Sequence, residues 1–352
     1  MAPSVSPLNW TGNKSCIFET ISGFMPEHST YIEPCMGSAE VFMRKKPVQK
    51  EYINDFNGDL VNFFRVVQSS PHVHQLIGRL YCSAPCEPLF KRNQKLLEET
   101  PNILDESIEF VRQCIELTDA DVERAAAVIE TQMYSFMSTG QSFALAKKDI
   151  TTKFAKLLSA CDRLRDAIIL HRDYKDVINY AACPSAFILL DPPYVGTEDM
   201  YQKSRFDGSE HAKLFAYMND IHVKFHGSCK FLITYNNDAH IRALADQYGF
   251  YTHVQPRPHC MAQGGKKKAS PSKAKDKTQD EEGKETEATA DDGKTDESLR
   301  QINPEESDKE KKVFEELLIA NYDLRRQANK NHFYYPGNCE QLQLTQYDPN
   351  PD

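Results

Sequence analysis

No apolar run in this sequence is long enough to span a membrane, and the N-terminus lacks a basic stretch followed by an apolar one. Both absences argue against a membrane protein and against secretion, so we expect a soluble protein of the cytoplasm. Disulfides are not expected either, because the ten cysteines are scattered as reduced thiols usually are. His72, His74, Cys82 and Cys86 have spacings too loose for zinc, and we therefore expect no metal site.

The chain also has fewer basic residues than acidic ones. The 42 lysines and arginines are outnumbered by 51 acidic residues, which gives a formal net charge of −9. A protein that binds nucleic acid through its overall charge would be basic, so any attraction to phosphate groups must be local. The apolar content of 40% is enough for a full core and one smaller module.

The run from Ala186 to Leu190 is continuously apolar and ends in Asp191-Pro192-Pro193-Tyr194. Such a run is typical of a strand buried on both faces of a parallel sheet, which places Asp191 at the carboxyl end of the strand, where α/β sheets bind ligands. The residue types suit the exocyclic amine of a nucleobase. Asp191 and the carbonyl of Pro192 can each accept one N–H, the two prolines stiffen the turn, and Tyr194 offers a ring for stacking. The alternative is a strand followed by an ordinary turn.

A second motif runs from Tyr31 to Phe42, where a short strand, a turn of small residues and the start of a helix follow one another. Gly37 and Ala39 would let a cofactor approach the backbone there. The turn is not a dinucleotide fingerprint, because Gly-x-Gly-x-x-Gly is absent, and no Gly-Lys-Ser/Thr follows it as in a phosphate loop. Further on, Asp55 follows a second predicted strand and could either hold ribose hydroxyls or cap the next helix.

With these motifs in place, the chain resembles the Dam-type (alpha-group) DNA adenine-N6 methyltransferases, which use S-adenosylmethionine. The resemblance rests on four segments in the family's order: Trp10 to Lys14, Glu33 to Phe42, Asn54 to Asn57 and Asp191 to Tyr194. It extends to Lys230 to Asn237 and to Glu316 to Tyr322, and so covers most of the chain. Cys35 and Ser38 depart from the family pattern, which more often has Phe and Gly at these positions, but both are small enough to fit.

The resemblance implies a role for individual residues. The catalytic residues would be Asp191, Pro192, Pro193 and Tyr194. The cofactor would be bound at its methionine end by Trp10 and Lys14, along its methionyl and ribose region by Glu33, Pro34, Gly37 and Ala39, at the ribose hydroxyls by Asp55, near the adenine by Asp173, and beside the reacting methyl group by Asp191.

The implied function is methyl transfer from S-adenosylmethionine to the N6 amine of adenine in double-stranded DNA, after the base has been flipped out of the duplex. Transfer to cytosine N4 is an alternative, because that amine is electronically similar. An RNA or protein amide methyltransferase, which more often has Asn in place of Asp191, and a catalytically silent DNA-binding relative are further alternatives. The resemblance suits a bacterial or phage origin and leaves open a cognate restriction endonuclease as partner, the recognition sequence and the oligomeric state.

The predicted fold is a Rossmann-like α/β methyltransferase domain, with a mostly parallel sheet whose last strand is antiparallel and with an inserted helical target-recognition module. Apolar residues at helical spacing define that module. The predicted parts are 1–76 and 169–262 for the catalytic domain, 77–168 for the helical module, 263–312 for a disordered charged insertion, and 313–352 for the last strand and tail.

Two segments offer local positive charge for DNA. Between Gln141 and Arg165, six basic residues face two acidic ones, and the predicted contacts are Lys147, Lys148, Lys153 and Lys156. A solvated helix face is the alternative.

The segment 263–312 has no aromatic residue and too little apolar surface to fold, which predicts disorder. Its Lys266 to Lys268 could assist phosphate contact, and an inert insertion is the alternative.

Overall fold

A computed structural model of the chain describes residues 5–108, 116–144, 149–197, 206, 208–257 and 314–331. The described residues up to Arg257 and those from Glu315 onward form one compact unit. The segment 263–312 and the lysines Lys147 and Lys148 lie outside the described residues, so the predictions for them stay predictions. Among the helices of the described ranges, none has both the length and the apolar character that crossing a membrane requires.

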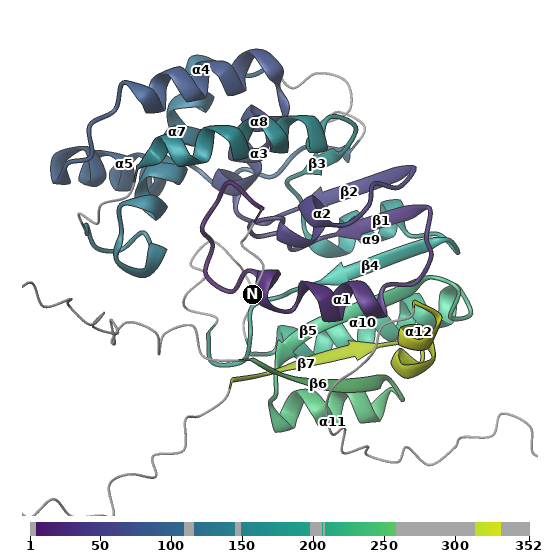
Figure 1. Ribbon diagram of the computed structural model, residues 1–352. Coiled ribbons are helices and arrows are strands. Elements are labelled where there is room, and N and C mark those ends of the chain that lie inside the picture. Colours follow the sequence, from purple (N-terminus) through teal and green to yellow (C-terminus); the bar gives the residue numbers. More distant parts are fainter. Residues whose placement is uncertain are drawn as a thin grey trace, which may run out of the picture. The chain divides into compact units, whose positions relative to one another are not determined.

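Seven strands of the described chain form one sheet in the order β3-β2-β1-β4-β5-β7-β6 (Figure 1). The strands from β3 to β5 are parallel to their neighbours, and β7 runs antiparallel to β5. This topology confirms the predicted Rossmann-like sheet. The strands are β1 (Thr30–Glu33), β2 (Lys50–Asn54), β3 (Ile168–Leu170), β4 (Ala186–Leu190), β5 (Lys230–Asn236), β6 (Tyr251–Arg257) and β7 (Phe314–Ala320).

Successive residues of the central strands pack into two separate hydrophobic cores, one on each face of the sheet. On β4, Phe187 and Leu189 belong to one core, whereas Ala186, Ile188 and Leu190 belong to the other. All five side chains are buried. Burial on both faces explains why the sequence of this strand is apolar without interruption.

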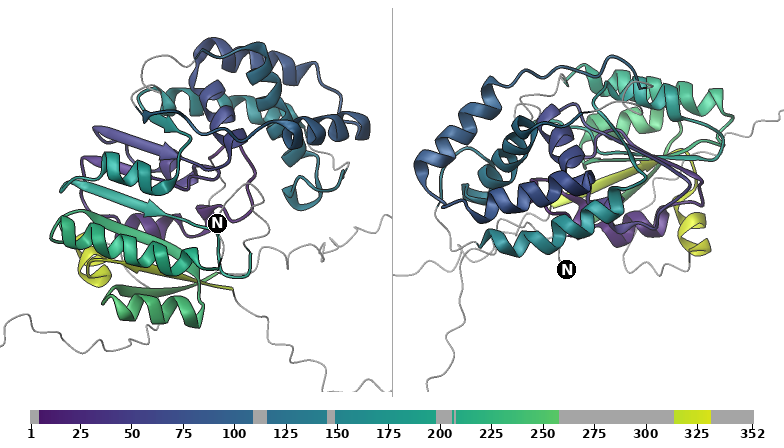
Figure 2. Two further views of the ribbon diagram at one scale, coloured as in Figure 1. Left: turned by 180° about the vertical axis from the view of Figure 1, so that it is seen from behind. Right: turned by 90° about the horizontal axis from the view of Figure 1, so that it is seen from above.

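Helices cover both faces of the sheet, as Figure 2 shows from two further sides. The helices α9, α10 and α11 pack on one face, and α1, α2, α3 and α12 pack on the other. The described helices are η1 (Lys14–Cys16), α1 (Phe18–Phe24), α2 (Glu40–Arg44), α3 (Gly58–Gln68), α4 (Ser70–Tyr81), α5 (Glu87–Glu99), α7 (Asp119–Met133), η2 (Phe136–Ser138), η3 (Ile150–Lys153), α8 (Phe154–Leu164), α9 (Tyr174–Ala181), α10 (Glu210–Lys224), α11 (Ala239–Gln247) and α12 (Leu324–Lys330).

The predicted helical module corresponds to a layer in which α4, α7 and α8 pack against α3, and α5 packs against α7. Arg124 of α7 pairs with Asp59 of α3 at 2.7 Å, and the hydrophobic core of the layer is continuous with one core of the sheet. α4 begins at Ser70, so the predicted boundary at residue 77 falls inside a helix. Residues 109–115, where apolar spacing also predicts helix, lie outside the described ranges.

The chain leaves β1 and β4 in opposite directions along the sheet, although these two strands are neighbours. From β1 it continues to β2 on one side, and from β4 it continues to β5 on the other. Parallel sheets bind ligands in the crevice outside the carboxyl ends of two such strands. Glu33 is the last residue of β1, and Asp191 directly follows β4, so both predicted site residues stand at this crevice.

Candidate functional site

The turn between β1 and α2 has a backbone that most side chains would strain. Gly37 has a φ of +48°, in the left-handed region that glycine tolerates best, and Ala39 has a φ of +53°. A Cβ atom added at Gly37 would lie 3.2 Å from Cδ1 of Trp10, so the indole packs directly over this glycine. The helix that follows, α2, is only five residues long. A ligand at this turn would therefore contact its backbone and the adjoining indole rather than the N-terminus of a long helix.

Asp55, just after β2, ties this turn to the neighbouring strand. Its carboxylate accepts the backbone N–H of Gly37 at 2.9 Å through one oxygen and that of Asn57 at 2.9 Å through the other. Burial raises the pKa of Asp55 to about 6, against the hydrogen bonds that favour its charged form. The helix cap at the start of α3 is Asn57 rather than Asp55, which leaves Asp55 facing the site.

The side chain of Asn54, the last residue of β2, connects the loops that follow β1 and β3. Asn54 was not among the predicted site residues. Its amide nitrogen donates to the carbonyl oxygens of Pro34 at 2.8 Å and Arg172 at 3.0 Å, and its side-chain oxygen accepts from the Arg172 N–H at 2.8 Å. Only 1% of its surface is exposed. Because these backbone groups follow β1 and β3, Asn54 fixes both loops relative to β2. Its position inside the Asn54-to-Asn57 motif was the available signal.

Glu33 lies buried below the turn. The hydroxyl of Tyr31 donates a hydrogen bond of 2.8 Å to its carboxylate. Burial, and to a lesser degree the negative charge of Asp191, raise the pKa of Glu33 to about 8, against the hydrogen bond from Tyr31. A positive charge in the cavity above would favour the ionised form of Glu33, so its protonation responds to what binds there.

Both carboxylate oxygens of Asp191 have a partner on another element. Lys14 places its ammonium 2.6 Å from Oδ2 and donates to the Gly12 carbonyl at 2.7 Å. The hydroxyl of Thr234, on β5, donates to Oδ1 at 2.7 Å. Lys14 is 5% exposed and Asp191 is 25% exposed. An ionised carboxylate oxygen can accept more than one hydrogen bond, so Asp191 retains capacity for a donor that enters from the cavity.

The ring of Tyr194 lies beside this ion pair. The Lys14 ammonium is 5.2 Å from the ring centroid, and the ring of Tyr235 on β5 lies 5.9 Å away at an angle of 36°. The Tyr194 hydroxyl points to Glu316 on β7. The sequence predicted Asp191 and Tyr194 together. Thr234 and Glu316 lie in two further segments that resemble the family, but no role at the site was predicted for either.

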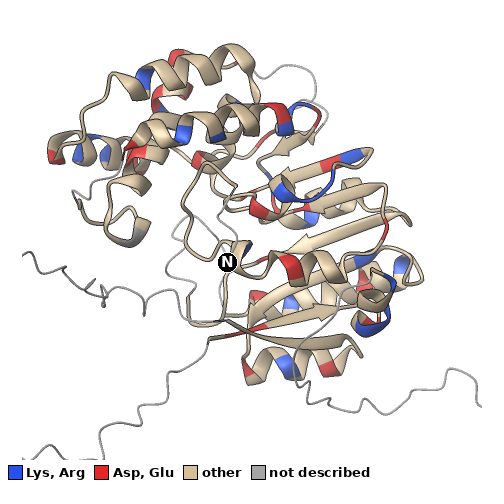
Figure 3. Cartoon of the chain, viewed as in Figure 1, with Lys and Arg blue, Asp and Glu red and all other residues tan. Residues whose placement is uncertain are grey.

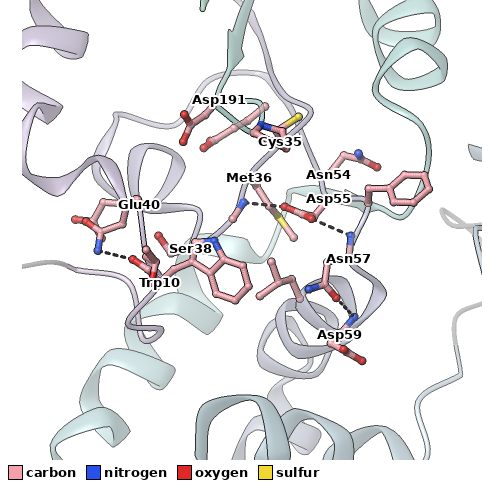
Figure 4. Close-up of a pocket in the computed structure, with 18 of the residues that line it drawn as sticks. Trp10, Cys35, Met36, Ser38, Glu40, Asn54, Asp55, Asn57, Asp59 and Asp191 are labelled. Atoms are coloured by element: carbon pink, nitrogen blue, oxygen red, sulfur yellow. Dashed lines mark hydrogen bonds between the residues drawn. The ribbon is translucent and has the colours of Figure 1, made fainter. Parts of the chain in front are cut away.

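Lys14, Glu33, Asn54, Asp55 and Asp191 line one cavity of about 520 Å³ at the carboxyl edge of the sheet (Figure 4). Three predicted site residues, Ala39, Pro192 and Tyr194, do not line it, although residues next to each of them in the chain do. On the side away from β4, the cavity reaches Val128, Thr131 and Gln132 of α7. Asp173 caps the start of α9 by accepting from the Lys175 N–H. The predicted site residues that line the cavity are Trp10, Lys14, Glu33, Pro34, Gly37, Asp55, Asp173, Asp191 and Pro193.

The predicted DNA-contacting lysines differ in position. Lys153 is buried, and its ammonium donates to the Asn9 side chain at 2.8 Å, so it braces the N-terminal loop from inside. Lys156 is half-buried on α8. Over the described residues, blue (Lys, Arg) and red (Asp, Glu) positions are interspersed along the ribbon of the helical layer (Figure 3).

Comparison with known proteins identifies a family and two similar proteins. Residues 10–256 match the family described as D12 class N6 adenine-specific DNA methyltransferase. A DNA N-6-adenine-methyltransferase of Escherichia phage P1 is 36% identical over 67 residues, which are 19% of this chain and 9% of that protein. The type II methyltransferase M1.LlaDCHI of Lactococcus lactis subsp. cremoris is 39% identical over 72 residues, which are 20% of this chain and 24% of that protein.

The two pairwise matches span less than a quarter of either relative's length. The family match is much longer, covers most of the chain, and includes the turn after β1, Asp55 and Asp191. It also takes in the whole parallel part of the sheet. The chain belongs to the D12 class N6 adenine-specific DNA methyltransferase family.

Proposed function

We propose that this chain transfers a methyl group from S-adenosylmethionine to the N6 amine of adenine in double-stranded DNA. The observation that carries the proposal is the position of Asp191. Its carboxylate follows β4 on the wall of the same cavity that Gly37 and Asp55 line. An acceptor for an amine and a site for a small cofactor therefore share one space.

The volume of the cavity supports a cofactor of the size of S-adenosylmethionine. A volume of about 520 Å³ lies within the range of small-molecule sites. The missing side chain at Gly37 preserves the space next to the Trp10 indole, because a Cβ there would press against the ring. With Lys14, Trp10 would bind the methionyl end of the cofactor.

Carboxylate groups along the cavity offer further contacts to the cofactor. The Asp55 carboxylate would accept hydrogen bonds from the ribose hydroxyls, and Asp173 would lie near the adenine. Glu33 would stand below the positively charged part of the cofactor, which would favour its ionised form. When bound, this cofactor supplies an electrophilic methyl group on a sulfonium, whose sulfur keeps the electron pair of the broken bond.

The residues after β4 would hold the amine of the flipped adenine. Asp191 accepts one N–H and the Pro192 carbonyl accepts the other, while Tyr194 stacks against the base. The nitrogen lone pair then forms the new bond to carbon. Positive charge develops on that nitrogen next to the Asp191 carboxylate, which stabilises it, and the proton leaves to water afterwards.

Lys14 has to change partner in this scheme. Its ammonium lies against Asp191 Oδ2, and a positive charge there opposes the charge that develops on the nitrogen. The methionyl carboxylate of the cofactor would offer Lys14 another acceptor. Asp191 would then be free to accept the amine through Oδ2, while Thr234 keeps Oδ1 oriented.

The net charge of −9 does not attract DNA, so a local group of basic residues would have to do so. We propose Lys147, Lys148 and Lys156 as phosphate contacts. Replacing all three by Ala should weaken binding to every sequence about equally and reduce the salt dependence of the affinity. An unchanged salt dependence would leave these lysines without a role in DNA binding.

The proposed reaction is tested with purified protein, S-adenosylmethionine carrying a labelled methyl group, and unmethylated genomic DNA, with total RNA as a parallel substrate. Digestion to nucleosides should place the label on N6-methyladenine, and Asp191→Ala should bind the cofactor but transfer nothing. Label on N4-methylcytosine or on RNA would replace the proposed substrate. Cofactor binding without any transfer would indicate a catalytically silent relative.

A further inference from the structure

Glu316 is buried near the start of β7, the strand that follows the segment 258–313. Its side chain is 0% exposed. The hydroxyl of Tyr194 donates to its Oε2 at 2.5 Å. A hydrogen bond to a carboxylate is stronger than one between neutral groups, so this contact constrains the tyrosine more than an ordinary side-chain bond would.

The contact crosses a strand. β5 lies between β4 and β7 in the sheet, and Glu316 is paired in register with Asn236 of β5. Tyr194, in the loop after β4, therefore reaches over the end of β5 to the next strand. Its ring lies against Tyr235, which precedes Asn236 on β5. The ring is thus fixed at its hydroxyl by β7 and along one side by β5.

The hydroxyl is suited to this role as a donor. Burial, and then the negative charges of Asp191 and Glu316, raise the pKa of Tyr194 well above its usual value. Tyr194 therefore keeps its proton throughout the range in which the protein would work, and the hydrogen bond persists. At the other end of the same loop, Thr234 of β5 orients Asp191.

We propose that Glu316 is a positioning residue that fixes the Tyr194 ring at the angle at which the flipped base stacks, so that the amine meets Asp191. This inference rests on the proposed function. Glu316 touches neither the base nor the cofactor in this scheme and acts only through Tyr194. Its removal should therefore lower kcat and leave cofactor affinity unchanged.

The test compares Glu316→Leu, Glu316→Gln and Tyr194→Phe in the full chain on unmethylated duplex DNA. Glu316→Leu removes the acceptor and should lower kcat about tenfold, the effect of losing one hydrogen bond to a charged group. Glu316→Gln keeps a carbonyl acceptor and should retain most of the activity. Cofactor affinity, followed by fluorescence of Trp10, should stay within about twofold of wild type, since neither residue lines the cavity.

A double-mutant cycle separates positioning from general loosening of the sheet. Tyr194→Phe should lower kcat about as much as Glu316→Leu, and the combined variant should be no slower than either alone, because both remove one contact. Tyr322→Phe is the matched control. It removes another buried tyrosine hydroxyl just beyond β7, one that donates to the Phe24 carbonyl, and should leave kcat unchanged.

The outcomes are distinct. Losses in kcat that add in the double variant, or a Glu316→Leu variant as fast as wild type, overturn the positioning role while leaving the proposed function intact. If Glu316→Leu does not fold, Tyr194→Phe decides: unchanged kcat overturns the role, and a loss confined to kcat supports it. A wild-type chain that methylates no DNA overturns the proposed function and the positioning role together.

Discussion

The Lys14 ammonium lies 2.6 Å from Oδ2 of Asp191, so the carboxylate proposed to hold the target amine is paired with a buried cation. Residue 14 precedes the sheet and residue 191 follows β4, so their contact ties the N-terminal segment, which lines the cavity, to the end of this strand. In the proposed reaction the target nitrogen becomes positively charged at this carboxylate, so the Lys14 ammonium has to leave Asp191 before the amine takes its place.

Removing one partner of this ion pair should destabilise the protein more than removing both. Asp191→Ala leaves the buried Lys14 ammonium with the Gly12 carbonyl as its hydrogen-bond acceptor among the described residues, which should lower the free energy of unfolding by about 1–3 kcal/mol. Combining it with Lys14→Met should recover part of that loss. Urea denaturation of the protein without cofactor measures both effects. Additive losses would show that the two side chains are not energetically coupled.

Trp10 is the single tryptophan of the chain and lines the cavity, so its fluorescence reports directly on the site. Adding S-adenosylmethionine should change its emission in a saturable way. Gly37→Ala should weaken the affinity about tenfold or more, because the new methyl group meets the indole 3.2 Å away and strains a φ of +48°. Gly78→Ala, which places its methyl group in open space on α4, is the control. Equal affinities for the two variants would argue against the proposed cofactor position.

Glu33 should make stability depend on pH. Its pKa is raised from 4.5 to about 8 in the folded protein, so between these values the folded state binds more protons than the unfolded state. The free energy of unfolding should therefore fall as pH rises through this window and level off above about 8. Glu33→Gln, which stays neutral, should lose this component.

The difference between wild type and Glu33→Gln isolates the effect from other titrating groups. Relative to the variant, wild type should lose a few kcal/mol between pH 5 and 8, of the order expected for shifts of this size. Denaturation midpoints at a series of pH values provide the measurement. Parallel pH profiles for the two proteins would mean that Glu33 titrates normally.

Asn54 should matter for both stability and cofactor affinity. Asn54→Ala leaves buried backbone groups of Pro34 and Arg172 without their partner, at a cost of about 3 kcal/mol. The loops after β1 and β3 would lose their common anchor, so KM for the cofactor should rise more than kcat falls. Asn329→Ala, at an exposed position on α12, is the control. If Asn54→Ala is as stable as Asn329→Ala, Asn54 does not have this structural role.

The elements that carry the site were predictable because their signals are local. The apolar run before Asp191 and the small residues around Gly37 are properties of consecutive residues, and the structure has a strand end and a left-handed turn there. The contacts of Asp191 were not predictable, because Lys14 and Thr234 reach it from distant elements. Sequence spacing does not say which side chains meet once the sheet has formed.

Lys153 illustrates the limit on surface predictions. Its neighbours give the segment a local excess of positive charge, which favours a contact with DNA. In the structure its side chain turns inward to Asn9, a residue 144 positions earlier in the chain. A charge count does not distinguish a lysine whose ammonium is buried against another part of the chain from one that faces solvent.

The most direct test of the central claim is a map of modified bases across the genome of a host that lacks its own adenine methylation and expresses this chain. Single-molecule sequencing should find N6-methyladenine at one short motif, and Asp191→Ala should abolish it while the protein still binds S-adenosylmethionine. Unmodified adenine in cells that contain the folded wild-type protein, or methylation that persists in Asp191→Ala, would contradict the account.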